Sequence, residues 1–548
     1  MTALGSSRHT MSAGSKASIL IACLVAGPIM STAQPQHEIG SLPKLDRTTV
    51  QGAVYERCLD SLRSQTDSSA VHAEVACAHP DWGPVEMNIE AAWQLLRAPD
   101  PSKGWAGEEP GAGVVIGQVD TGYTLHPAVK YRLALADAMN TLKPRDPAQD
   151  TMSKGLLGFL TFGLLHNPAF RDPGHGTKTA SIAIGDPRQA PNPSVSGWVT
   201  GVAPAARLIP VRGTKGPGLL VVGPSQAAKA ICYLAGGVVK PDEEESGDLC
   251  HAEPDPKWSG KGLAIPRLGT PVQVISIARG APTSENLLKN KTFRRVLDFA
   301  RDRGIIIVAA SGDHETFTVY PAESCAAISV GTSVISGAPW TSRRPFIGSP
   351  HARRADPLEG DPLGKGSPRR LDACGQASGL KIDVSAPGAG VWRAVTNGRE
   401  GQYRAESPYG YGVGKGTSFS APAVAGIAAM WLQYRQAEFA AKHYERTAIP
   451  YVFSYVLRRG GGARRAQEVC EQAKKAWNLA SEPRCDAVQR AWMAEDGKTS
   501  IFGAGIVDAL GVLTAALPDL PAICDDLAVR GGQTDRAALK CPGSMPVK

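Results

Sequence analysis

The chain has 548 residues, of which 43% are hydrophobic and 20% charged, and its formal net charge is +8. This balance is that of an ordinary globular protein, and the length suffices for one large domain or for two to three average ones. The basic residues are scattered and are not interleaved with aromatic ones. The composition therefore argues against nucleic acid as a partner and favours a solvated basic surface.

Residues 1–33 have the parts of a secretory signal. Arg8 and Lys16 precede an apolar stretch, Ala17 to Met30, which small residues follow up to Ala33. We predict cleavage after Ala33 and a protein that is secreted or periplasmic. The stretch is short and interrupted by glycine and proline, so we expect no stable insertion into a membrane. A sequence similar to a lipoprotein box ends at Cys23, but the apolar core continues past that cysteine, which disfavours lipidation.

The cysteines indicate disulfide bonds. There are 11 of them, and loss of Cys23 with the signal leaves ten, an even number in an exported chain. None has the spacing of a metal site. Buried free thiols are the alternative, which so many cysteines disfavour. The predicted pairs are neighbours in the sequence: Cys58 with Cys77, Cys232 with Cys250, Cys325 with Cys374, Cys470 with Cys485, and Cys524 with Cys541.

Two polar residues stand where predicted elements begin or end. The apolar run Gly113 to Val119 reads as a buried parallel strand, and it ends at Asp120 in an Asp-Thr-Gly sequence. His175 lies in Gly-His-Gly-Thr, where a loop opens a helix. Residues 131–170, between these two motifs, have no sustained periodicity and are predicted to be a surface loop.

The other elements follow in order along the chain. We expect a short amphipathic helix at 88–93 and polar sequence with one helix, 50–63, before it. Further strands are predicted at 208–212, 272–277 and 305–310, with helices at 225–234 and 292–303. The acidic run 242–248 reads as a solvated loop. A calcium site there remains open, but no ligand spacing supports it. Residues 341–373 read as a surface loop.

Ser418 lies where a glycine loop meets an apolar helix. The sequence Gly-Thr-Ser-Phe-Ser-Ala-Pro-Ala-Val-Ala-Gly covers residues 416–426, and the helix is expected to run to about residue 434. A serine at this turn can cap the helix, and its hydroxyl would lie beside free backbone N–H groups, as a nucleophile and an oxyanion site require. A capped helix with small residues for close packing is the alternative.

Residues 435–500 are predicted to be helical, polar and inserted.

This serine motif resembles that of the subtilisin-like serine proteases, the subtilases. The Asp-Thr-Gly and His-Gly-Thr motifs resemble the other two of that family, and they come in its order of Asp, His, Ser. The resemblance implies an α/β fold with three layers, in which a mostly parallel central sheet has helices on both faces and carries loop inserts. It also implies that Ser418 attacks a peptide carbonyl, His175 takes its proton, and Asp120 orients and stabilises the imidazole.

The resemblance also implies roles around the triad. The backbone N–H of Ser418 would be one oxyanion donor, and the second in subtilases is an asparagine that is Asp313 here, which puts the rate in doubt. Ala278, Arg279 and Gly280 would lie beside the substrate, although Arg279 replaces an apolar residue. Val319 would form the floor of the S1 pocket and favour small or medium P1 side chains.

The domain plan follows from these matches. We predict a signal peptide at 1–33, an N-terminal extension or short pro-segment at 34–85, a catalytic domain at 86–515 and a tail without its own core at 516–548. The predicted function is a secreted serine endopeptidase acting on proteins or peptides, as a monomer and without a cofactor or metal. The alternatives are a binding module on a subtilase frame, motivated by Asp313 and Arg279, and an esterase or transferase using the same triad.

Overall fold

The computed structural model describes most of the region that carries the motifs. The described residues are 79–150 except 104, then 174–186, 200–214, 224–240, 249–254, 265–280, 291–313, 318–337, 381–396, 409–477 and 503–529, with isolated positions at 58, 76, 77, 485, 486, 488, 536 and 539–541. They all belong to one of the two units of the chain, Lys44–Lys548. The predicted signal at 1–33 and the loop at 341–373 lie outside the described residues, and so does the helix at 50–63 apart from Cys58.

A central sheet organises this unit. Within the described residues it has nine strands, and neighbouring strands are parallel except for the first pair. Their order is β12 (Ala463–Arg464), β13 (Ile506–Val507), β9 (Val384–Pro387), β8 (Ala327–Ser333), β7 (Ile306–Ala310), β6 (Val274–Ile277), β1 (Val115–Asp120), β3 (Arg207–Arg212) and β2 (Met139–Asn140). The predicted α/β class with a mostly parallel sheet is confirmed.

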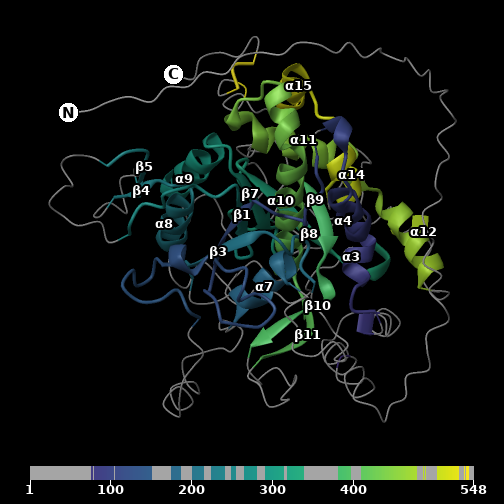
Figure 1. Cartoon of the computed structure of the whole chain (residues 1–548), viewed down its shortest axis with the longest axis horizontal. Helices are drawn as coiled ribbons and strands as arrows, with labels where there is room; N and C mark the ends of the chain where they lie inside the picture. Colours follow the sequence, from purple (N-terminus) through teal and green to yellow (C-terminus); the bar gives the residue numbers. More distant parts are fainter. Residues whose placement is uncertain are drawn as a thin grey trace, which may run out of the picture. The chain divides into compact units, whose positions relative to one another are not determined.

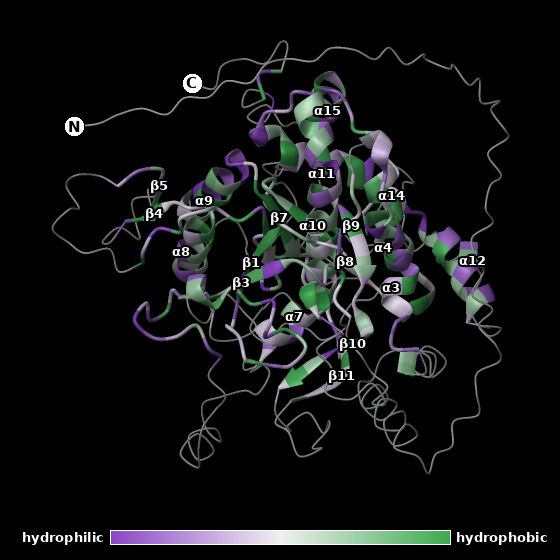
Figure 2. Ribbon diagram, in the orientation of Figure 1, coloured by the Kyte–Doolittle hydropathy of each residue, from purple (hydrophilic) through white to green (hydrophobic). Residues whose placement is uncertain are grey.

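Helices cover both faces of the sheet because successive side chains of a strand point to opposite faces. Val308 packs into the core cluster that includes α10 (Thr417–Ala441), whereas its neighbours Ile307 and Ala309 pack into the cluster that includes α8 (Pro224–Leu234) and α9 (Lys291–Asp302). In Figure 1, α8 and α9 lie to one side of the strands. Figure 2 shows hydrophobic residues concentrated in the central strands and in α10.

The remaining elements are short. They are α3 (Trp82–Glu86), α4 (Ile89–Arg97), α7 (His175–Ile184), α11 (Ile449–Arg458), α12 (Ala466–Ala476), α14 (Ala509–Thr514) and α15 (Leu520–Val529), with the strand pairs β4 (Val238–Val239) with β5 (Cys250–His251) and β10 (Ala389–Thr396) with β11 (Tyr409–Lys415). Single 3-10 turns lie at Pro101–Lys103, Leu135–Asp137, Ile335–Gly337 and Arg446–Ala448.

The region after α10 differs from its predicted character. α10 continues to Ala441 rather than ending near residue 434, and α11 is no polar insert, because Val452 and Phe453 are fully buried in the main core cluster. α15 belongs to the same cluster through Ile523 and Leu527. The predicted tail therefore contributes a helix to the core of the unit.

Four of the predicted disulfides are confirmed. They join Cys58 to Cys77, Cys232 to Cys250, Cys470 to Cys485 and Cys524 to Cys541. Cys325 is also disulfide-bonded, and Cys374, its predicted partner, lies outside the described residues.

No helix in the described part of the chain is both long and apolar enough to span a membrane.

Candidate active site

The three predicted catalytic residues gather at one edge of the sheet. Asp120 is the last residue of β1, and the register that pairs Val119 with Ile277 places Ala278 directly beside it. His175 is the first residue of α7, and Ser418 lies in the first turn of α10. The carboxyl ends of parallel strands are where α/β proteins form their sites, because loops and helix N-termini converge there.

Asp120 and His175 form a buried pair. The Nδ1 atom of His175 lies 2.8 Å from Oδ1 and 2.9 Å from Oδ2 of Asp120, and the two side chains are 4% and 1% exposed. The backbone N–H of Thr121 donates to Oδ1 (2.7 Å), and the hydroxyl of Thr179 donates to Oδ2 (3.2 Å). Burial raises the pKa of Asp120, but the charges of His175 and Arg279 and these hydrogen bonds outweigh it and hold the pKa well below its usual range. An ionised Asp120 fixes the proton of the neutral imidazole on Nδ1 and leaves Nε2 as an acceptor.

Ser418 does not cap α10 as the sequence suggested. The helix begins at Thr417, its N-cap is Gly416, and Ser418 is the second helical residue. The φ of Gly416 is 132°, a conformation that side chains disfavour, which explains the glycine before the serine. The hydroxyl of Ser418 donates to the backbone carbonyl of Ala278 (2.9 Å). The next residue, Phe419, lies against the ring of His175, with 6.1 Å between ring centroids.

Asp313, the oxyanion candidate, reaches the start of α10. It follows the end of β7, and its Oδ1 accepts hydrogen bonds from the backbone N–H of Thr417 (2.8 Å) and from the Thr417 hydroxyl (2.9 Å). The carboxylate is therefore hydrogen-bonded to the residue before Ser418. It lies at the N-terminal end of α10, where the helix dipole favours a negative charge.

Arg279, which the sequence placed beside the substrate, turns its side chain into the protein. Its Nε donates to Oδ1 of Asp120 (3.2 Å), and its side chain is only 1% exposed. Arg279 is thus the fourth donor to this carboxylate, after His175, Thr121 and Thr179. The sequence alone did not associate Arg279 with the triad.

Val319 fills a space that two glycines leave open. A Cβ atom at Gly280 would overlap the Cγ2 atom of Val319, and one at Gly312 would overlap Cγ1. Val319 itself is 5% exposed, and its backbone N–H donates to Ser311 O. The role of Val319 as the floor of an S1 pocket stays a prediction.

Comparison with protein families shows to which family the chain belongs. The model of the subtilase family of peptidases matches residues 111–449, more than half of the chain. The chain belongs to the subtilase family. No curated protein matches it in sequence.

Solved structures similar to this subtilase include a protease from Pseudoalteromonas arctica (19% identity, TM-score 0.44, covering 79% of this chain and 96% of that one). MycP1 with its N-terminal propeptide removed has 17% identity and a TM-score of 0.42, over 80% of this chain and 98% of that one. Fervidolysin from Fervidobacterium pennivorans has 16% identity and a TM-score of 0.42, over 80% of this chain and 46% of that one.

The subtilase site contains a carboxylate that the sequence did not reveal. Oδ2 of Asp150 accepts hydrogen bonds from the hydroxyl of Thr121 and from the backbone N–H of Gly174, each 2.6 Å long. Gly174 immediately precedes His175, so Asp150 ties the start of α7 to the end of β1. Burial raises the pKa of Asp150. Asp150 lies in the stretch predicted as an irregular loop, where no periodicity marks it.

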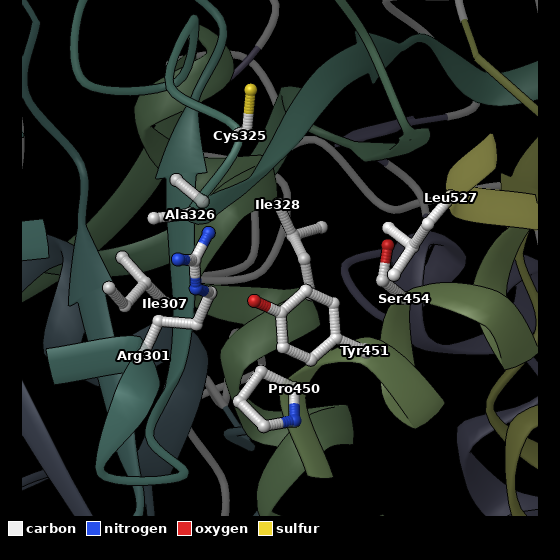
Figure 3. A pocket seen from close by; sticks show the side chains of 10 residues that line it. Arg301, Ile307, Cys325, Ala326, Ile328, Pro450, Tyr451, Ser454 and Leu527 are labelled. Carbon is white, nitrogen blue, oxygen red and sulfur yellow. The ribbon is translucent and has the colours of Figure 1, made fainter. Parts of the chain in front are cut away.

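A small pocket elsewhere in this subtilase is unrelated to the site. Arg301, Cys325, Ile328 and Tyr451 are among its lining residues (Figure 3). Ile328 lies near the amino end of β8, whereas Asp120 is at the carboxyl end of the parallel β1, so the pocket is at the opposite edge of the sheet. The guanidinium of Arg301 stacks on Tyr451 and pairs with Asp298.

In the part of the chain that is described, no group of three or more His, Cys, Asp or Glu could hold a metal ion.

Proposed function

We propose that this subtilase is an exported serine endopeptidase in which Ser418, His175 and Asp120 act as nucleophile, base and orienting carboxylate. The observation that carries the proposal is the buried contact between His175 Nδ1 and Asp120 at the edge of the sheet where Ser418 lies in the first turn of α10. Export is supported by the signal-like N-terminus and by the disulfides.

The proposed reaction starts when the Ser418 hydroxyl gives up its hydrogen bond to Ala278 O and turns to Nε2 of His175. Catalytic hydrogen bonds often form only once substrate is bound. Oγ then attacks the peptide carbonyl while Nε2 takes the proton, and Asp120 stabilises the imidazolium. The backbone N–H of Ser418 stabilises the oxyanion. Collapse of the tetrahedral intermediate passes the proton to the leaving amine and leaves an acyl-enzyme, which water hydrolyses by the same steps.

Labelling with a fluorophosphonate probe tests the proposal. We expect the wild-type protein to label, whereas Ser418→Ala does not and loses several orders of magnitude in peptide hydrolysis. Ser420→Ala is the matched control, because Ser420 lies on the same helix but its hydroxyl is buried against Thr332 and Ala386 O. A wild-type protein that folds but neither labels nor cleaves peptides would instead be a binding module on the subtilase frame.

A further inference from the structure

A histidine and an arginine side chain converge on one carboxylate oxygen in the candidate site. His175 Nδ1 (2.8 Å) and Arg279 Nε (3.2 Å) both contact Oδ1 of Asp120. Their side chains are 4% and 1% exposed, so solvent barely reaches the contact. The Nη2 atom of Arg279 is buried and has no hydrogen-bond partner among the described residues. Arg279 therefore forms its ion pair with Asp120.

This geometry places the guanidinium of Arg279 close to the imidazole of His175. Arginine keeps its positive charge at every pH at which proteins are folded. The two donor nitrogens bond to one oxygen, so they lie no further apart than the sum of the two hydrogen-bond lengths. At such a distance in a buried site, two positive charges repel each other strongly and salt screens them little. Protonation of His175 is thus opposed by Arg279, although Asp120 favours it.

Other charged residues lie on the elements that meet at this site. Lys178 lies on α7 with His175, Asp150 contacts Thr121 and Gly174, Asp313 lies at the start of α10, and Arg393 of β10 stacks on Phe419 at 4.9 Å from its ring centroid. The Arg279 variants keep all four of these residues. A comparison of Arg279 variants with the wild-type protein therefore isolates the effect of the guanidinium.

We propose that Arg279 is a positioning residue that extends peptide hydrolysis to lower pH, because its guanidinium shares Asp120 with His175 and keeps the imidazole neutral in more acidic solution. This inference rests on the proposed peptidase function. It also accounts for an arginine at a position where a substrate-facing residue was expected.

The test is the pH dependence of kcat/KM for one peptide substrate, measured for the wild-type protein, Arg279→Gln and Arg279→Met. Both substitutions remove the charge, and methionine also keeps much of the side-chain volume. We expect the acid limb of both profiles to move to higher pH by about one unit. A merely structural role would lower activity at all pH values without moving the limb. An unmoved limb in both variants would overturn the inference.

A second readout separates this inference from the proposed function. NMR signals of His175 can be titrated in Ser418→Ala with and without Arg279→Met, which needs no catalytic activity. We expect the His175 titration to move to higher pH when Arg279 is absent. If no form of the protein cleaves peptides, the peptidase proposal fails while the titration still decides whether Arg279 opposes protonation. An unchanged titration overturns the role of Arg279 even if the protein is an active peptidase.

Discussion

The carboxylate of Asp313 accepts two hydrogen bonds from Thr417, one from its backbone N–H and one from its hydroxyl. Thr417 is the residue before Ser418, so these bonds fix the distance between Asp313 and the nucleophile proposed here. A Cβ atom at Gly416 would lie 3.2 Å from the other carboxylate oxygen, Oδ2, which places Oδ2 beside the glycine loop. The side chain at position 313 is therefore anchored at the start of α10, and its role as an oxyanion residue stays a prediction.

We expect Asp313→Asn to raise turnover at pH 8 by about tenfold or more. An asparagine can keep the Thr417 hydrogen bonds through its oxygen and supply an N–H donor in place of Oδ2, and an oxyanion donor is commonly worth about a hundred- to a thousandfold. The measurement is kcat on one peptide substrate from pH 6 to 9. Asp313→Ala, which can neither accept nor donate, should show no such gain. Equal or lower turnover of the asparagine variant at every pH would exclude a handicapped oxyanion role for Asp313.

Changes of size at Val319 should shift P1 preference in opposite directions. Val319→Ala deepens the space between Gly280 and Gly312, and we expect kcat/KM for Phe over Ala at P1 to rise by about tenfold or more, since one group in an apolar pocket is worth about 1–3 kcal/mol. Val319→Ile should lower that ratio. A P1 library measures it, and Val239→Ala, a buried valine in β4, controls for general loosening. Identical P1 profiles for all variants would place Val319 outside the pocket.

Lys381 is predicted to stabilise the segment next to Val319. Its buried ammonium donates to the carbonyls of Ala322 (3.2 Å), Ser324 (2.7 Å) and Ala327 (2.5 Å), and it lies 3.4 Å from Asp383. Removing the ammonium leaves three backbone carbonyls without this donor and takes one of two cationic neighbours from Asp383, which keeps Arg458 at 3.6 Å. We expect Lys381→Met to lower the free energy of unfolding by about 3–5 kcal/mol.

Urea denaturation measures this loss. Lys143→Met is the matched control, because Lys143 is 73% exposed and its removal should change stability by no more than about 0.5 kcal/mol. A similar stability for both methionine variants would mean that the carbonyl contacts of Lys381 contribute little.

The partner of Cys325 is predicted to be Cys374. Cys325 is disulfide-bonded, and every other described bridge joins cysteines that are neighbours in the sequence. Peptide mapping without reduction should therefore recover one peptide pair that contains these two residues. Recovery of Cys325 with a different cysteine would refute the pairing.

Much of the site could be predicted because its residues lie in short continuous motifs. Asp120 ends a mostly apolar run, which is typical of a strand buried on both faces, and β6 and β7 are likewise mostly apolar. The Ser418 motif is recognisable because its glycine, small residues and proline each meet a local backbone requirement. The edge strands β2 and β12 were missed, since two residues are too few for any periodicity.

Local sequence accounted for the strand that carries Asp120, the helix that His175 opens and the loop before Ser418, because backbone preferences and hydrophobic runs act over a few residues. The contact between Asp120 and Arg279 joins positions 159 residues apart, and it exists because β1 and β6 are neighbours whose register sets Val119 beside Ile277. Asp150 meets Thr121 and Gly174 in the same way, across loops of irregular sequence. Strand order and register follow from packing of the whole core, so only the tertiary structure decided which residues contact Asp120, Thr121 and Gly174.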